Sequence, residues 1–322
     1  MRCDSFVVET DVEFPTDTGL LFEAVRKALG WVADLSDAQG LPGWRQHAYH
    51  LRKLKQAQRR IRTLRHSTAK DERKRQAHRD YLEQAQTLLE RVRETRAQWL
   101  QRRVIPLGLA TLDDYVQHAE RQIDQIRRRV LKGEVIPPAE KVFSIFEPHT
   151  EWISKGKAGV PVELGRRVCV VEDQYRFILH HYVMAKTTDD QVAVAVTTAA
   201  KTRFPAVQSI SFDKGFHSSA NQTQLPAIVD QVVLPRKGQL SAVLKAVEAD
   251  PDFVRLRRCH SAVASAINAL EAHGLDRCPD HGLDGFKRYV ALAVVARNSQ
   301  RLGAILQEQE RRRHRGPYRK AA

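Results

Sequence analysis

The sequence predicts a mixed α/β (α+β) fold in which a sheet is interrupted by a large basic helical insertion after its first strand. Three observations predict it. A short β-favouring run opens the chain, long basic segments with narrow apolar stripes at helical spacing follow, and short strand-like and helical runs then succeed one another after Ala139. The 322 residues, 42% of them hydrophobic, suffice for one large domain or two ordinary ones with a sizeable core.

The first strand is predicted over residues 2–8, where Phe6 and the two following valines favour β structure. Residues 11–15 are expected to be extended, because a proline disfavours helix in the residue before it. Thr16 or Asp17 then caps a helix whose apolar stripe runs over residues 20–32.

Residues 44–132 predict three further helices, each with a thin apolar stripe on a charged surface, arranged as a hairpin or bundle. Between residues 45 and 103 the chain holds 18 Lys and Arg against 6 Asp and Glu, a net charge of +12. Most of the whole chain's net charge of +15 therefore lies in this segment. Pro137 and Pro138 end the whole helical region that begins at residue 44.

The rest of the chain predicts a series of strands and helices. Strands are expected over residues 141–146, 162–171, 175–184, 207–212 and 229–234, the second and third forming a hairpin. Helices are expected over residues 189–204, 218–225, 240–249, 254–273 and 283–307, and residues 311–315 form a basic, disordered tail.

This order of elements is that of an RNase H-like fold. We therefore predict a discontinuous RNase H-like domain from residues 1–15 and 140–280, with an inserted helical bundle or hairpin at 16–139. Residues 281–322 form a C-terminal helix and basic tail.

The positive charge predicts a polyanionic partner, with nucleic acid the first candidate. A basic membrane-surface protein is the alternative, but no stretch approaches the roughly 20 apolar residues of a membrane span. No signal peptide is recognisable, and four cysteines are too few for a disulfide scaffold. We therefore expect a cytoplasmic protein without a membrane partner.

Two aspartates lie on or directly after predicted strands. Asp4 lies on the first predicted strand and Asp213 directly follows the strand 207–212. Two divalent metals about 4 Å apart stabilise the attacking and leaving oxygens of a phosphodiester together. Mg²⁺ prefers carboxylate oxygens, so carboxylates must converge from separate elements, and neighbouring strand ends can supply them.

Four sequence blocks, in the right order over nearly the whole chain, resemble those of bacterial insertion-sequence DDE transposases, the ISNCY-type group in particular. The blocks are Cys3-Asp4-Ser5 with Glu9 to Asp17, Phe146 to Thr150 with Lys155 to Gly159, Phe212-Asp213-Lys214-Gly215-Phe216, and His260 to Leu275.

The resemblance implies that Asp4 and Asp213 are catalytic metal ligands, with two Mg²⁺ (or Mn²⁺) ions. It makes Lys155, Lys157 and Lys214 candidate phosphate contacts. The implied partner is double-stranded DNA, both element ends and target. A homodimer holding two ends, in the bacterial cytoplasm at the nucleoid, is expected as well.

The chain departs from the family pattern at Ala264, where the family has the final Glu. A methyl group cannot bind a metal, and Glu271 lies seven residues on, roughly 10.5 Å along a helix. We therefore expect impaired catalysis. A second departure is that Met1 lies three residues before Asp4, whereas such transposases usually carry an N-terminal helical DNA-binding region. Either the chain is a truncated product, or the insertion and tail recognise DNA.

Alternatives stay open. The chain can be a DNA-binding protein without catalysis, such as a transposition inhibitor, or an unrelated RNase H-like nuclease. The basic helices can be solvated faces, and Glu147 is favoured as a turn acid over a metal neighbour. A zinc site is a disfavoured alternative for Cys259, His260, His273, Cys278 and His281, because the adjacent pair 259 and 260 faces different sides of a helix. Trp44, Trp99 and Trp152 could stack on flipped bases, but core or interface packing is favoured for each.

Overall fold

The computed structural model describes residues 1–40, 42–65, 71–103, 107–154 and 161–315. The chain divides into two compact units. The sheet unit comprises Met1–Asp11 and His149–Ala322, and the helical unit, Val12–Pro148, interrupts it in sequence. No helix in the described ranges carries an apolar stretch that could cross a bilayer.

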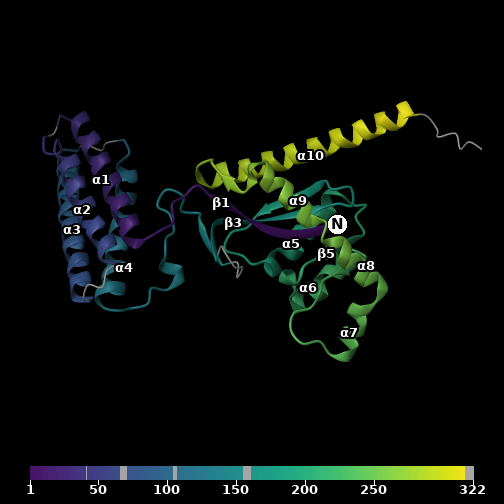
Figure 1. The fold of residues 1–322 in the computed structure, drawn as a ribbon. Coiled ribbons are helices and arrows are strands. Elements are labelled where there is room, and N and C mark those ends of the chain that lie inside the picture. The colour runs from purple at the N-terminus through teal and green to yellow at the C-terminus, as the bar shows by residue number, and fades with distance from the viewer. Residues whose placement is uncertain (41, 66–70, 104–106, 155–160, 316–322) are drawn as a thin grey trace, which may run out of the picture. The chain divides into compact units, whose positions relative to one another are not determined.

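The helical unit consists of α1 (Asp17–Ala38), α2 (His47–Arg65), α3 (Asp71–Gln101) and α4 (Leu109–Ile126), as Figure 1 shows. Short turns Arg127–Leu131 and Pro138–Glu140 follow. As predicted, Thr16 caps α1, and its hydroxyl accepts the N–H of Gly19 at 3.1 Å. The three predicted apolar stripes pack with α1 around one core, in which Leu29, Leu54 and Trp99 are fully buried.

The sheet unit is built on a mixed sheet, which confirms the mixed α/β class that the sequence predicts. Its strands are β1 (Arg2–Thr10), β2 (Glu151–Ser154), β3 (Val162–Glu172), β4 (Ile178–Val183), β5 (Ser209–Phe212), β6 (Gln231–Val233) and β7 (Arg277–Cys278). The main path runs β2-β3-β1-β5-β6, while β4 pairs with β3 and β7 with β1. Strand β3 is antiparallel to β1, β2 and β4, whereas β5 runs parallel to β1 and β6.

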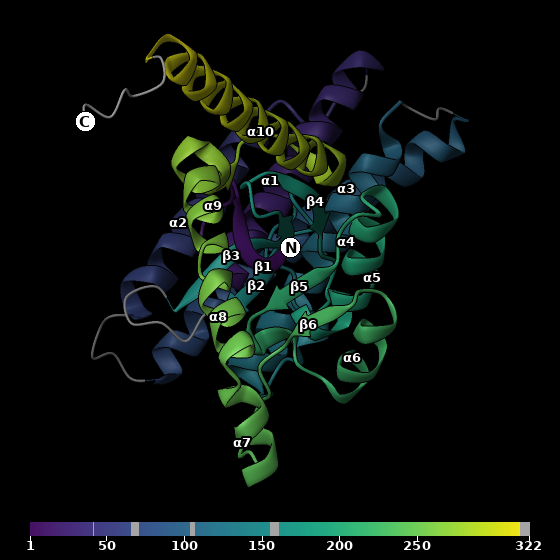
Figure 2. The same cartoon turned by 90° about the vertical axis from the view of Figure 1, so that its right-hand side faces the viewer.

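Helices cover both faces of this sheet (Figure 2). The helices of this unit are α5 (Asp189–Arg203), α6 (Ser219–Gln224), α7 (Ala242–Ala249), α8 (Pro251–His260), α9 (Val263–Leu270) and α10 (Gly282–Arg315), with short helical turns Lys214–Phe216, Leu225–Ala227 and Glu271–Leu275. Helix α7 contacts α8 and projects away from the sheet. Side chains alternate along each strand, so Cys3 and Cys169 pack toward α5 while Phe6 and Val168 pack toward α9 and α10. This alternation decides which face each functional residue reaches.

Three predictions about single elements were wrong. Residues 141–146 form no strand, because the Ser144 hydroxyl accepts the N–H groups of Phe146 and Glu147 and closes a turn. The helix predicted over 254–273 is broken between α8 and α9, where the Ser261 hydroxyl donates back to the Arg258 carbonyl at 2.8 Å. Residues 311–315, predicted to be disordered, continue α10.

Candidate functional site

Asp4 on β1 and Asp213, which directly follows β5, are neighbours. The parallel register pairs Cys3 with Phe212, which places the following residue of each chain segment side by side. Cys3 and Phe212 both pack toward α5. Because side chains alternate along a strand, Asp4 points away from the face on which Cys3 packs toward α5, and the charge of Asp213 acts on it from the neighbouring strand end.

Short hydrogen bonds fix the orientation of both carboxylates. Asp4 Oδ1 accepts the N–H of Ser5 at 2.8 Å. Asp213 caps the turn that begins at Lys214, and its Oδ1 accepts the N–H of Gly215 at 2.8 Å. A side chain at position 215 would crowd this arrangement, since a Cβ there would stand 2.8 Å from Asp213 Oδ1. Glycine therefore lets the carboxylate approach the backbone.

A third carboxylate, which the sequence analysis missed, belongs to Asp189. It is the first residue of α5, whose start is fixed by a capping box between Thr188 and Gln191. The Ser5 hydroxyl donates to Asp189 Oδ1 at 2.7 Å. Asp189 Oδ2 lies 3.1 Å from the place that a Cβ of Gly215 would take, close to Asp213. An acid at a helix start is common, so only the tertiary contact with Ser5 distinguishes this one.

The two neighbouring acids disfavour the charge of Asp4. Burial raises the pKa of Asp4 to about 6, the Ser5 N–H opposes the shift, and the negative charges of Asp213 and Asp189 add to it. A divalent cation relieves this kind of repulsion, because it compensates the carboxylates at close range.

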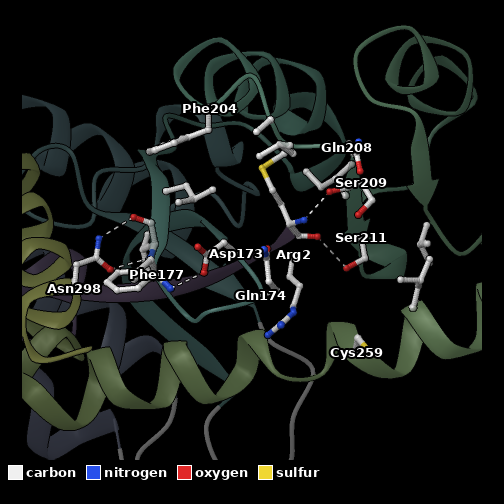
Figure 3. A pocket seen from close by; sticks show the side chains of 18 residues that line it. Arg2, Asp173, Gln174, Phe177, Phe204, Gln208, Ser209, Ser211, Cys259 and Asn298 are labelled. Carbon is white, nitrogen blue, oxygen red and sulfur yellow. Dashed lines mark hydrogen bonds between the residues drawn. The ribbon is translucent and has the colours of Figure 1, made fainter. Parts of the chain in front are cut away.

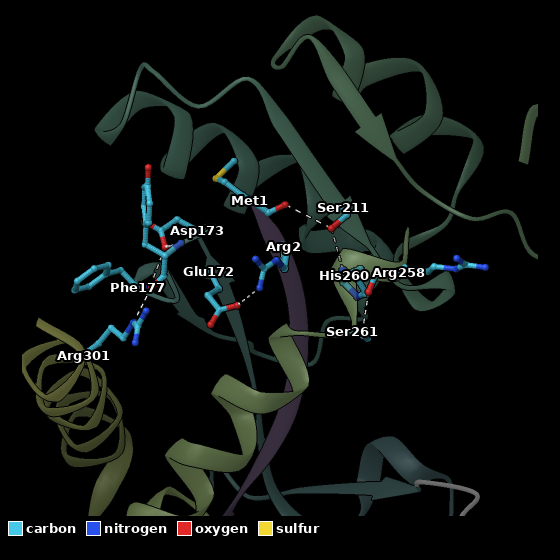
Figure 4. Close-up of polar contacts among 11 residues, drawn as sticks. Met1, Arg2, Glu172, Asp173, Phe177, Ser211, Arg258, His260, Ser261 and Arg301 are labelled. Carbon is cyan, nitrogen blue, oxygen red and sulfur yellow. Dashed lines mark hydrogen bonds and ion pairs between the residues drawn. The ribbon is translucent and has the colours of Figure 1, made fainter. Parts of the chain in front are cut away.

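The end of α8 packs against β5, and Figure 4 shows His260 facing Ser211. His260 is buried, and its Nδ1 lies 3.1 Å from the Ser211 hydroxyl. Burial lowers the pKa of His260, while the charge of Asp213 opposes that shift. The contact with Ser211, two residues before Asp213, places the end of α8 beside the end of β5.

Ala264 stands four residues after His260, at the start of α9. It is exposed, while Val263 beside it is buried in the core under β1. Its methyl group supplies no metal ligand. Glu271 begins the turn that follows the far end of α9.

The two carboxylates are the type of ligand that Mg²⁺ and Mn²⁺ prefer, but they are too few for a complete site. Asp4 and Asp213 provide the carboxylate oxygens that these ions prefer. In the part of the chain that the structure describes, however, no three His, Cys, Asp or Glu side chains are placed together to hold a metal ion. The Ser5 hydroxyl donates to Asp189 Oδ1, and the methyl group of Ala264 offers no atom that could bind a metal.

The other residues singled out in the sequence lie in different parts of the structure. Lys214 is exposed directly after Asp213, whereas Lys155 and Lys157 lie outside the described residues. Glu147 is buried, and its N–H donates to the Ser144 hydroxyl at 3.0 Å, in keeping with the hydrogen-bonded form of the predicted turn acid. Trp99 is fully buried in the helical unit.

A cavity of about 790 Å³ lies at the beginning of β1 (Figure 3). Met1, Phe177 and Ser209 line it, together with Arg2, whose guanidinium pairs with buried Glu172 at 2.9 Å. Its described lining includes none of the three carboxylates, so it is separate from the candidate site.

Comparisons of the chain with family models, with curated proteins and with solved structures found no match.

Proposed function

We propose that the chain is a DDE-type transposase core, in which metal-dependent DNA strand cleavage and strand transfer are impaired by Ala264. The observation that supports the proposal is the parallel register of Cys3 with Phe212, which makes the next residues, Asp4 and Asp213, neighbours. The strand order supports an RNase H-like fold, since β4, β3 and β1 are antiparallel neighbours and β5 and β6 continue parallel to β1. The transposase part of the proposal rests on the resemblance of the four sequence blocks to those of DDE transposases.

The proposed chemistry is hydrolysis followed by transesterification. Two bound divalent ions would stabilise the attacking and leaving oxygens. Asp4 and Asp213 would hold them, while the N–H groups of Ser5 and Gly215 orient the two carboxylates. A water oxygen attacks the phosphorus at the element end, and the P–O3′ bond breaks to free a 3′-hydroxyl. That hydroxyl then attacks target DNA and displaces a second 3′-oxygen.

Lys214, exposed directly after Asp213, is the proposed phosphate contact. The partners proposed are double-stranded DNA and a second copy of the chain, because two element ends must be held together. A location at the bacterial nucleoid follows from the same proposal.

The test is nicking of supercoiled plasmid in Mg²⁺ or Mn²⁺ by the full chain and by Ala264→Glu. We expect nicking by Ala264→Glu and little by the unchanged chain. Ser265→Glu, which adds the same acid one position away, and Ala264→Glu with Asp213→Asn should both be inactive. Equal turnover by the unchanged chain and Ala264→Glu would refute the claim of impairment.

The second candidate is a DNA-binding protein without catalysis, such as a transposition inhibitor that occupies ends or forms mixed oligomers. The lack of a third ligand among the described residues favours it. If Ala264→Glu binds DNA but never nicks it, this candidate replaces the first. Cleavage of RNA–DNA hybrids would instead support an unrelated RNase H-like nuclease.

A further inference from the structure

Helix α2 carries an unbalanced positive charge. Residues 45–65 contain eight Lys and Arg and no Asp or Glu. A solvated helix of ordinary composition balances its cations with acids three or four residues away, and α2 has none to offer.

The positive charge is concentrated opposite the buried face of the helix. Leu54 and Ile61 are buried in the core of the helical unit. The opposite face is exposed and consists of residues that recur every three or four positions. We call these the α2 ridge: Tyr49, Arg52, Lys53, Gln56, Arg59, Arg60 and Thr63.

Most of the ridge's arginine charge has no counter-charge within the protein. Among the described residues, Arg60 pairs with Asp80 at 3.5 Å, while Arg52, Arg59 and the flanking Arg62 form no ion pair. Helix α3 differs, because its Arg79 and Arg96 pair with Glu72 and Asp113. The lack of internal compensation on α2 points to an external polyanion.

We propose that the α2 ridge binds the phosphate backbone of duplex DNA, independently of base sequence. The inference rests on the proposed function only in sharing DNA as the partner. Arg52 and Arg59 stand about 10.5 Å apart along the helix, and a major groove is about 12 Å wide. Two arginine side chains at this spacing reach phosphates on both strands that border one groove.

An anionic membrane fits the ridge less well. A helix that lies in a membrane interface buries a face of Leu, Phe or Trp beneath its cations. Tyr49 is the only large apolar side chain on the ridge, and the apolar face of α2 is already buried against its own unit.

The test measures binding of the full chain to a labelled random-sequence duplex by fluorescence anisotropy, in EDTA, over a series of KCl concentrations. The ridge variant is Arg52→Gln with Arg59→Gln and Arg62→Gln. The control replaces three exposed lysines elsewhere, Lys141, Lys245 and Lys287, with Gln. Both variants lose three positive charges, and circular dichroism checks that both fold.

We expect the ridge variant to bind about tenfold or more weakly at moderate salt. The slope of log K against log salt should become shallower by up to roughly 2.7, which is about 0.9 for each lost phosphate contact. Replacing the same arginines with Lys should restore most of the affinity. The lysine control should lose little.

Equal binding by the ridge variant and the control would overturn the inference and leave the proposed chemistry standing, since EDTA excludes cleavage. No binding of duplex by the unchanged chain would overturn the proposed function as well. Tighter binding to anionic phosphatidylserine vesicles than to duplex, lost in the ridge variant, would assign the ridge to a membrane and overturn the DNA inference.

Discussion

Replacing Asp4 with Asn should stabilise the protein at neutral and alkaline pH. The carboxylate is mostly buried beside two other acids, which raises its pKa from 3.8 to about 6. Asn has a similar shape, keeps an oxygen that can accept the Ser5 N–H, and carries no charge.

The magnitude follows from linkage between proton binding and folding. A carboxyl whose pKa is raised by folding stabilises the folded state fully below pH 3.8, and this contribution is lost as the pH rises through about 6. The rise corresponds to roughly 3 kcal/mol at 1.36 kcal/mol per pKa unit. Asp4→Asn should therefore gain up to about 3 kcal/mol over the unchanged chain at pH 8 and almost nothing at pH 4.

Urea unfolding followed by circular dichroism at several pH values, without divalent metal, measures this difference. Asp34→Asn on α1 is the control, because Asp34 is exposed and far in sequence from the site. A constant difference between Asp4→Asn and the unchanged chain from pH 4 to pH 8 would refute the electrostatic argument, and so would a loss of stability at pH 8.

Three further changes test the fold by urea unfolding. Arg2→Met should destabilise the protein by about 3–5 kcal/mol, because it leaves buried Glu172 unpaired, and adding Glu172→Gln should restore much of the loss; no restoration would mean that the ion pair is not the cause. Gly165→Ala should cost more than about 2 kcal/mol, since a Cβ there would stand 2.0 Å from the Val8 carbonyl oxygen, and an unchanged midpoint would contradict that register. Thr16→Ala should cost about 1 kcal/mol through loss of the α1 cap, whereas Thr16→Ser should not; equal losses would place the effect elsewhere.

The helices and most strands were predictable because their signals are local. The stripe in α1 and its Thr16 cap depend only on residues within a few positions. The region before β2 was mispredicted because a run such as residues 141–146 favours β structure, while the Ser144 hydroxyl bonds that close a turn are invisible in a pattern. The break after His260 was missed for a similar reason, since apolar spacing continues across it.

Part of the candidate site was predictable because two of its acids lie at recognisable strand positions in the sequence. Asp4 and Asp213 could be selected by strand position and sequence block together. Asp189 could not, because its link to them is a hydrogen bond from Ser5, 184 positions away. The contact between His260 and Ser211 is likewise a product of packing α8 on β5.

The central claim is that Asp4, Asp213 and position 264 share one metal site that lacks its third acid. Titration of Mn²⁺ into the full chain, followed by electron paramagnetic resonance of the free ion, tests it most directly. Ala264→Glu should bind Mn²⁺ about tenfold or more tightly than the unchanged chain, in line with one added carboxylate ligand, and adding Asp213→Asn should abolish the gain. Equal Mn²⁺ affinity of Ala264→Glu and the unchanged chain would contradict the claim.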